Sequence, residues 1–437
     1  MKKYIIALSV LCLSCQEKSD TSENDKLLVE IQVEAGLKNK VDRLLLSDVA
    51  ADVDIIPLET SKESVIGYVF NMACGEENLV FNELHRVTLF DKVDGKFKGA
   101  IGDLGTGPTD YYYCGGVGVD ELRKYVHLFS SPDVKTYDFE GKFVKSVKVA
   151  LPGASMWAEA NPGRDTRTYL YFNGKHVFRR MLPVFDGSKN IWQLGMADTT
   201  GRYFAKYSEP SCLDYQEGLN KHNSGGKGFE LEEVQYMWGA SSPVLNRYYN
   251  HVNCLFDSND TIYRYSEKEN TLKPRYILQC GGRPSFQEMH QMGKPWSFFD
   301  YTFVVDVLEG KDFLYLVAEK ERSSYLLRVD KKDGSIRAIE NVGVLEESQL
   351  MKVKQRKVTV PEFTNDLCGG LPFFPRSQTD RQWIALYEAS DLLEQINPEE
   401  LKKSEVLLPD KRDRLVQILQ NLKEDDNPVV MIVTLKK

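Results

Sequence analysis

The chain has 437 residues, a formal net charge of −8 and a hydrophobic fraction of 42%. It contains no basic run that could neutralise a phosphate backbone, which disfavours nucleic acid as a partner. Beyond the first fifteen residues no apolar stretch approaches the roughly 18 residues of a transmembrane helix, so we expect no spanning segment.

Residues 1–15 are typical of a bacterial export signal, because Lys2 and Lys3 precede a short apolar run. The run ends in Cys12-Leu13-Ser14-Cys15, which resembles a lipobox, although Cys12 stands where leucine is usual. We expect residues 1–14 to be a signal peptide and Cys15 to carry a lipid that anchors the protein to a membrane without spanning it. The alternative is an ordinary secretory signal with an incidental cysteine. The expected location is the bacterial cell envelope, at the outer membrane.

Residues 15–26 are polar and charged with almost nothing to bury, which predicts a flexible tether. Residues 27–33 then alternate in a way that predicts a strand. We expect residues 27–437 to form one folded unit.

A hairpin pattern recurs along this unit. Residues 134–149 show it best: a strand ends in Tyr137-Asp138, the chain turns at Gly141, and a second strand follows. In five copies the first strand closes on a polar residue: Asp91, Asp138, Asp198, Ser266 and Asp330. A sixth copy lacks the glycine turn and matches only in the strand 382–387 and the following Glu388.

The spacing of these copies indicates the architecture. They lie about 47 to 68 residues apart, and a four-stranded propeller blade fills about 40–50 residues. The sequence therefore predicts an all-β fold, a six-bladed β-propeller with insertions, in preference to unrelated hairpins in a sandwich. Recurrence of Asp91, Asp138 and Asp330 at one blade position predicts a structural role, such as bonding the amides of the turn.

The C-terminal part changes character. Residues 399–403 and 411–423 are predicted to be helical, with Leu415, Ile418, Leu419 and Leu422 on one face and Asp410 as an N-cap. An apolar strand follows at residues 429–435. We expect a small C-terminal helical insertion outside the propeller, with the N- and C-terminal strands together completing one blade.

Four segments carry a resemblance to a known family. They are residues 46–60, which contain Ile56-Pro57-Leu58-Glu59-Thr60, the glycine-rich residues 101–111, residues 365–375, and residues 425–435. In this order they resemble a family of six-bladed β-propeller lipoproteins of unknown function that is similar to the NHL-repeat propellers. Residues from about 153 to 293 match this pattern poorly. The resemblance implies the fold and the lipid anchor, and names neither ligand nor reaction.

The glycine-rich segment invites a phosphate-loop interpretation, with Gly102, Gly105 and Gly107. A dinucleotide loop needs a helix directly after it, whereas Tyr111, Tyr112 and Tyr113 follow here without a helix start. A turn between blades is the favoured interpretation. The tyrosines either line a sugar-binding surface or pack between blades.

Residues 208–233 form the main insertion, polar and rich in glycine, which we expect to be a long loop on one propeller face near Trp238. Long loops on a rigid scaffold often carry function. The candidate ligand-binding residues are Tyr111, Tyr112, Trp157, Arg164 and Trp238. For each of them, packing or simple exposure to solvent is the alternative.

No motif for catalysis or metal binding is present. The six histidines form no H-x-x-x-H pair, and there is no G-x-S-x-G elbow and no zinc-type spacing. We therefore predict no cofactor and no metal site. The six cysteines after the signal are expected to be mostly free, buried thiols: Cys74, Cys114, Cys212, Cys254, Cys280 and Cys368.

Two functions remain open. The first is a binding module that captures a glycan, a peptide or a partner protein on one face of a membrane-anchored propeller. The alternative is a propeller hydrolase, lyase or lactonase with acidic residues or a metal at the central channel. The absence of a catalytic motif favours the first.

Overall fold

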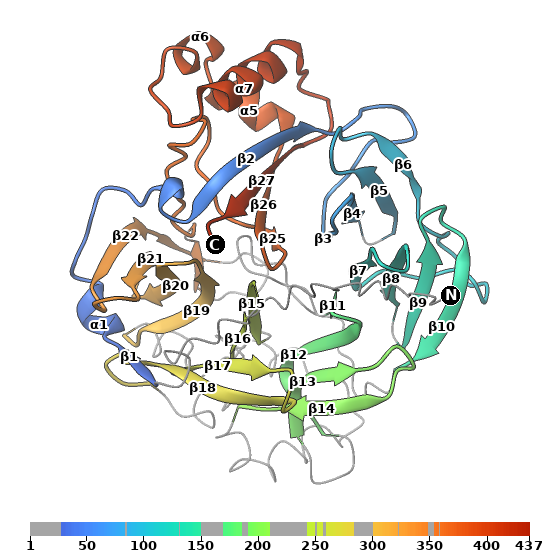
Figure 1. Cartoon of the computed structure of the whole chain (residues 1–437), viewed down its shortest axis with the longest axis horizontal. Coiled ribbons are helices and arrows are strands. Elements are labelled where there is room, and N and C mark those ends of the chain that lie inside the picture. Colours follow the sequence, from blue (N-terminus) through green and yellow to red (C-terminus); the bar gives the residue numbers. More distant parts are fainter. Residues whose placement is uncertain are drawn as a thin grey trace, which may run out of the picture.

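Six antiparallel sheets, which we call blades 1 to 6, surround a common axis in the computed structural model (Figure 1). The structure describes residues 28–83, 85–130, 132–149, 169–185, 191–209, 243–249, 251–256, 259–283, 300–321, 323–347, 354–357 and 359–437. The predicted six-bladed β-propeller is confirmed, with a few helices near the C-terminus. Within the described residues no helix has the length and apolar character to cross a membrane.

Each of the first three blades has four strands. From the inside outward, blade 1 has β3 (Asn71–Cys74), β4 (Asn78–Asn82), β5 (Val87–Asp91) and β6 (Phe97–Ala100). Blade 2 has β7 (Gly116–Asp120), β8 (Tyr125–Ser130), β9 (Asp133–Asp138) and β10 (Phe143–Lys148). Blade 3 has β11 (Tyr169–Phe172), β12 (Lys175–Phe185), β13 (Ile191–Ala197) and β14 (Tyr203–Tyr207).

The remaining blades vary this plan. Blade 4 has β15 (Val244–Tyr248), β16 (His251–Leu255), β17 (Thr261–Ser266) and β18 (Thr271–Leu278), with β1 (Val29–Ile31) as a fifth, parallel strand beside β18. Blade 5 has β19 (Phe303–Glu309), β20 (Phe313–Lys320), β21 (Ser323–Asp330) and β22 (Ile336–Val342). Blade 6 has β25 (Ser377–Gln378), β26 (Gln382–Tyr387), β27 (Val429–Leu435) and β2 (Ala50–Pro57).

Side chains on both faces of each blade are apolar, because every blade is sandwiched between two others. In β4, Leu79 and Phe81 pack toward blade 6 with Ile384, while Val80 packs toward blade 2 with Val117. All five residues of β4 are buried. The core therefore lies between the blades as a series of apolar layers around the ring, rather than at its centre.

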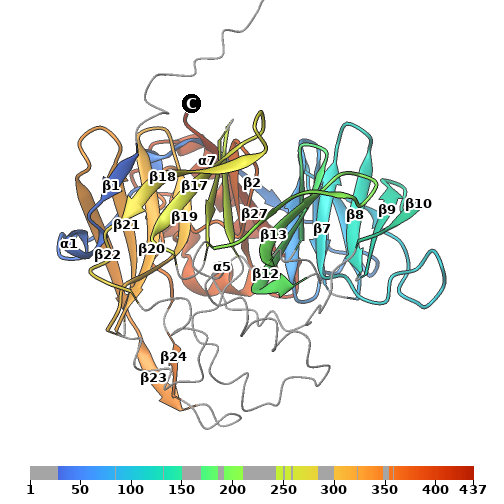
Figure 2. The same cartoon turned by 90° about the horizontal axis from the view of Figure 1, so that it is seen from below.

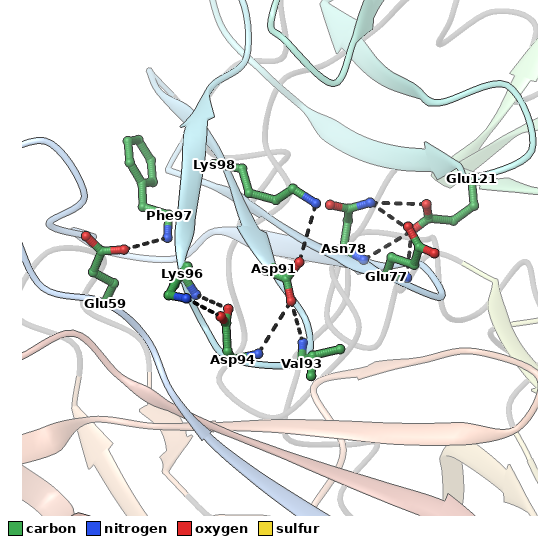
Figure 3. Close-up of polar contacts among 10 residues, drawn as sticks. All are labelled: Glu59, Glu77, Asn78, Asp91, Val93, Asp94, Lys96, Phe97, Lys98 and Glu121. Carbon is green, nitrogen blue, oxygen red and sulfur yellow. Dashed lines mark hydrogen bonds and ion pairs between the residues drawn. The ribbon is translucent and has the colours of Figure 1, made fainter.

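The turns between third and fourth strands explain the repeated aspartate. Asp91 Oδ1 accepts the backbone N–H of Val93 over 2.8 Å (Figure 3). Asp138 accepts the N–H of Lys142 over 2.8 Å, and Asp330 does the same with that of Lys332 over 2.8 Å. The carboxylates satisfy amides that the turn leaves without strand partners, so the predicted structural role is correct.

Blade 6 departs from the predicted register. The strand 382–387 is β26, the second strand of its blade, so Glu388 is not equivalent to the aspartates that close third strands. It directly precedes helix α5 (Ala389–Gln395). The third strand is β27, and α5, α6 (Pro398–Leu401) and α7 (Pro409–Asn421) are inserted between the two.

The buried face of helix α7 is the one that the sequence predicts, whereas its N-cap is a different residue. Leu415, Ile418 and Leu419 are buried in the largest core cluster, as the periodicity predicts. Helix α7 begins at Pro409, so Leu408 is its N-cap and Asp410 lies in the first turn. Proline suits the first helical position because its missing N–H would have no partner there.

Strand β2 closes the ring. It pairs antiparallel with β27, from Ala50 opposite Leu435 to Pro57 opposite Val429. An N-terminal segment thus supplies the outermost strand of the blade that contains the C-terminal strand. The strand expected at residues 27–33 is shorter, and β1 gives way to a short helix, α1 (Val33–Gly36).

A matched pair of glycines tests the contact between blades. Gly95 and Gly334 have φ angles of 73° and 72° in equivalent turns. A Cβ at Gly95 would lie 2.2 Å from the backbone oxygen of Pro57 in β2, whereas a Cβ at Gly334 meets nothing within 4 Å.

Gly334→Ala should lower the free energy of unfolding by about 1–2 kcal/mol, from the left-handed backbone alone. Gly95→Ala should lower it by a further ~1–3 kcal/mol, because the turn must move away from β2. Urea unfolding of both variants measures the difference, and equal losses would show that the turn does not rest on β2.

Candidate functional site

The two faces of the ring differ in the length of their connections. On one, which we call the tight-turn face, the connections within blades have at most five residues, such as 75–77 and 331–335. On the other, the long-connection face, the outermost strand of each blade ends and the innermost strand of the next blade begins, at least 13 residues later in the sequence, as across residues 58–70 and 101–115. Figure 2 shows β23 (Val344–Glu347) and β24 (Lys354–Lys357) of the last connection below the ring and the C-terminus above it.

Exposed tyrosines stand at the mouth of the ring on the long-connection face. Tyr68 is 72% exposed, Tyr112 71% and Tyr301 36%. Each lies two to four residues before an innermost strand, β3, β7 or β19 respectively. The exposed apolar tips of the tight-turn face are aliphatic instead, Val93 and Leu122. Aromatic side chains are therefore available to a ligand around this mouth.

The connection 58–70 holds Tyr68 on an ordered backbone. Asn427 donates to two backbone carbonyls of this connection and accepts the N–H of Ile66 over 2.8 Å. Arg86 donates to two further carbonyls, and Glu83 accepts a backbone N–H over 2.7 Å. Such anchoring reduces the ordering that binding would require.

The connection 101–115 holds Tyr112 in the same way. Tyr137 donates its hydroxyl to the carbonyl of Thr109 over 2.7 Å, and Lys135 donates to that of Pro108 over 2.9 Å. Gly102 has a φ of 64° and lies against the Tyr137 ring, where a Cβ would come within 2.5 Å. The glycines let the chain turn tightly from blade 1 to blade 2. The strand β7, rather than a helix, follows this connection.

The residues selected from the sequence fall into three groups. Tyr111 is 2% exposed and packs in the core cluster between blades 1 and 2, where burial raises the pKa of its phenol well above the usual value. Tyr112, its neighbour, points into solvent. Trp157, Arg164 and Trp238 lie outside the described residues, as do Cys15 and the insertion 208–233 apart from Ser208 and Glu209, so as sites these remain predictions.

Sequence reasoning missed Asn71 and Tyr68. Asn71 begins β3 and is 7% exposed, and neither its Nδ2 nor its Oδ1 has a hydrogen-bond partner although both atoms are buried. A buried amide without partners typically costs about 1–3 kcal/mol, so this residue needs an explanation. The only signal in the sequence is an asparagine at the start of an otherwise apolar strand.

On the tight-turn side, β15 occupies the centre of the ring. Asn246 donates to Gln378 of blade 6 over 2.7 Å and accepts the backbone N–H of Glu309 of blade 5 over 2.9 Å. Tyr248 donates to the carbonyl of Lys436 over 2.7 Å, which places the C-terminal residues near the ring's centre (Figure 1). Polar groups here bond to one another.

A buried ion cluster joins blades 4 and 5. Glu309 is 1% exposed and accepts from Arg264 at 2.9 Å, from Lys331 at 2.6 Å and from Asn253 at 2.6 Å. Burial raises the pKa of Glu309, but the two cations outweigh burial and lower it to about 2. The carboxylate stays ionised and its oxygens are saturated, which fits a clamp between blades better than a proton-transfer group.

Two buried histidines meet between blades 2 and 3. The ring centroids of His127 and His176 are 5.1 Å apart. Their Nδ1 atoms hydrogen-bond with Thr136 over 2.9 Å and with Tyr169 over 2.8 Å, and their Nε2 atoms have no partner. Burial lowers the pKa of His127 to about 3 and that of His176 to about 4, so both rings are neutral at pH 7.

Metal-binding groups do not gather in the part of the chain that the structure describes. There, no group of three His, Cys, Asp or Glu side chains could hold a metal ion. The thiols of Cys74, Cys114, Cys254, Cys280 and Cys368 are free, and all but that of Cys74 are buried. Cys212 lies outside the described residues.

These features define a six-bladed β-propeller with one closed, tightly turned face and one face of long connections. The chain belongs to the family described as "Domain of unknown function (DUF4934)", whose model matches residues 28–434. No curated protein matches it. The predicted family of unknown function is thus confirmed in this form, whereas the NHL-like label stays a prediction.

A solved structure shares the fold. A protein of Bacteroides fragilis, presumed to be exported, has a TM-score of 0.58 at 15% identity, over 94% of this chain and 100% of its own. A member of the DUF4221 family from Bacteroides vulgatus has a TM-score of 0.36 at 12% identity, over 69% of this chain and 87% of its own. The first likeness supports the six-bladed architecture.

The histidine pair predicts a loss of stability in mild acid. The unfolded chain protonates near the ordinary pKa of 6.5, whereas the folded rings resist protonation down to about 4 and 3. As the pH falls from about 6.5 toward 4.5, the unfolded state is therefore favoured by up to roughly 1.4 kcal/mol per pH unit for each histidine.

His176→Gln should remove about half of this slope in urea unfolding measured from pH 7 to 4.5. His85→Gln, at an exposed position, is the matched control and should leave the slope unchanged. Identical slopes in the wild type and His176→Gln would contradict the buried, neutral state.

Proposed function

We propose that the protein is an exported binding module whose propeller captures a glycan, a peptide or a partner protein on its long-connection face. One observation carries this proposal: every passage between blades and every exposed tyrosine among the described residues belongs to the same face. Variable connections on a rigid scaffold are the usual place for recognition. The opposite face is made of short turns and of polar groups that bond to one another.

Export and anchoring rest on the N-terminal segment. The lysines and short apolar run before Cys15 fit a lipoprotein signal, and a relative in fold is presumed to be exported. Residues 16–27 could span about 40 Å when extended, since each residue reaches ~3.3–3.6 Å. A tether of that reach would let the propeller turn its long-connection face away from the membrane.

A comparison of the two faces tests the binding role. The probes are an array of neutral and anionic oligosaccharides and a peptide library, applied to the full-length protein in detergent. Replacing Tyr68, Tyr112 and Tyr301 together by serine should weaken binding at least tenfold. The control replaces Val93 and Leu122 by serine on the tight-turn face and should bind as the wild type does.

Equal binding by both variants, or the lack of any ligand in either library, would count against this function. Conversion of a bound probe into a product would instead favour the hydrolase, lyase or lactonase.

The lipid anchor has its own test. Cys15→Ala should move the protein from the membrane pellet to the soluble fraction of fractionated cells, because the thiol that would carry the lipid is gone. Cys74→Ala is the matched control and should stay in the pellet. Membrane partitioning that does not change in Cys15→Ala would show that this cysteine carries no anchor.

A further inference from the structure

At the junction of blades 1 and 2, an unpartnered amide lies on a strand whose preceding connection carries one exposed tyrosine, and the connection to the next blade carries another. Asn71 follows Tyr68 by three residues and begins β3. Ala73 packs in the core cluster shared with blade 2, and side chains two residues apart on a strand share a face. Asn71 therefore faces blade 2, whose first strand β7 follows Tyr112 by four residues.

A cross-strand neighbour fixes the place of Asn71 more closely. Asn71 stands opposite Asn82 of β4. Asn82 donates its Nδ2 to the carbonyl of Cys114 over 2.9 Å, near the end of the connection that carries Tyr112. Two asparagines thus meet at this junction, one bonded to the connection and the other with its amide atoms unused.

The charged groups that bond to the two connections are engaged except for one atom, Oε1 of Glu83, which is buried without a hydrogen-bond partner. Arg86 donates to the carbonyls of Val65 and Glu63, Lys135 donates to that of Pro108, and Glu83 accepts the N–H of Gly67. Apart from that oxygen, which suits a hydroxyl donor, these groups stabilise the two connections. An occupant of this junction is better matched if it is uncharged.

The amide of Asn71 offers two donors and an acceptor within one planar group. A pair of neighbouring hydroxyls, each both donor and acceptor, complements such an amide. A tyrosine ring offers an apolar body with a polar edge, which suits a ligand that has one C–H face and a polar rim. Pyranose sugars combine both features.

We propose that this junction is a subsite for an uncharged sugar residue of a glycan. The ring of Tyr68 or Tyr112 stacks on the C–H face of the sugar, and the amide of Asn71 exchanges hydrogen bonds with two adjacent hydroxyls. Because both amide atoms are buried, side chains at this junction must move to admit the sugar. This inference rests on the proposed binding function and narrows its ligand to a neutral glycan.

Because the amide of Asn71 has no partner, its replacement should affect the melting temperature and the affinity for the sugar differently. In Asn71→Leu, no hydrogen bond is lost on folding and an unsatisfied amide disappears, so the melting temperature should stay the same or rise. Affinity for the sugar should fall at least tenfold, because the leucine leaves the hydroxyls unpaired. A residue with a purely structural role would lower the melting temperature instead.

The experiment uses isothermal titration of the full-length protein in detergent with maltohexaose, cellohexaose, xylohexaose and mannohexaose, and with a hyaluronan hexasaccharide as the anionic comparator. At least one neutral probe should bind. At least one of Tyr68→Ala and Tyr112→Ala should weaken that binding at least tenfold, whereas Val93→Ala, at an exposed position of the tight-turn face, should change it less than twofold.

The outcomes separate this inference from the function it rests on. Binding of a neutral probe with full affinity in Asn71→Leu and in both tyrosine variants would overturn the subsite and leave the binding module standing. Binding of the anionic probe alone, or of peptides alone, would overturn the neutral glycan. The absence of any ligand among glycans and peptides would overturn both proposals.

Discussion

The pairing of β2 with β27 is the interaction on which the ring depends. Blade 6 lies between two apolar layers, one shared with blade 1 and one shared with blade 5 and the helices. Those layers stay covered only if blade 6 is complete, and its outermost strand comes from the N-terminal side of the chain. Seven register pairs from β2 to β27 thus join residues that are almost 400 positions apart in the sequence. A closed ring covers the apolar blade faces that an open arc of blades would leave exposed at each end.

Closure of the ring accounts for the many hydrogen bonds between blades on the tight-turn face. The C-terminal strand delivers Lys436 to the centre of the ring, where Tyr248 of blade 4 binds its carbonyl. Asn246 and Glu309 then connect blades 4, 5 and 6 through groups that are buried and paired. Glu121 of blade 2 likewise accepts the N–H groups of Glu77 and Asn78 of blade 1, at 3.1 Å each (Figure 3). With one face held by short turns and buried bonds, the other face can vary its connections without loosening the ring.

The sequence predicts the propeller well because its strongest local signal is repeated. An aspartate that binds turn amides and a glycine at positive φ mark the third strand in blades 1, 2, 3 and 5, whereas blade 4 has Ser266 and, at a φ of 54°, Asn270 instead. Blade 6 has no such turn, because its fourth strand, β2, precedes the other three strands in the sequence. The sequence pattern therefore predicts the strand 382–387 to be the third of its blade, whereas it is the second. The prediction of Asp410 as an N-cap is wrong for a local reason. Helix α7 already begins at Pro409, so the aspartate falls within the first turn.

The candidate site is less accessible to sequence reasoning, because exposure and missing partners are tertiary properties. Tyr112 was found through its glycine-rich neighbourhood, but nothing local distinguishes it from the buried Tyr111. Tyr68 and Asn71 belong to no motif.

Three buried polar groups show why Asn71 stands apart. Glu309 is fully paired, and each of the two histidines has one nitrogen bonded within an aromatic layer, so their burial is explained by the contacts between blades. Asn71 has no such contact for either atom, yet it begins an innermost strand beside exposed tyrosines on the face of long connections. An unsatisfied amide at that place does not stabilise the fold, since an apolar residue would fit the strand better. A ligand that completes its hydrogen bonds would account for the asparagine, and the exposed tyrosines of the two adjoining connections would provide the surface on which that ligand rests.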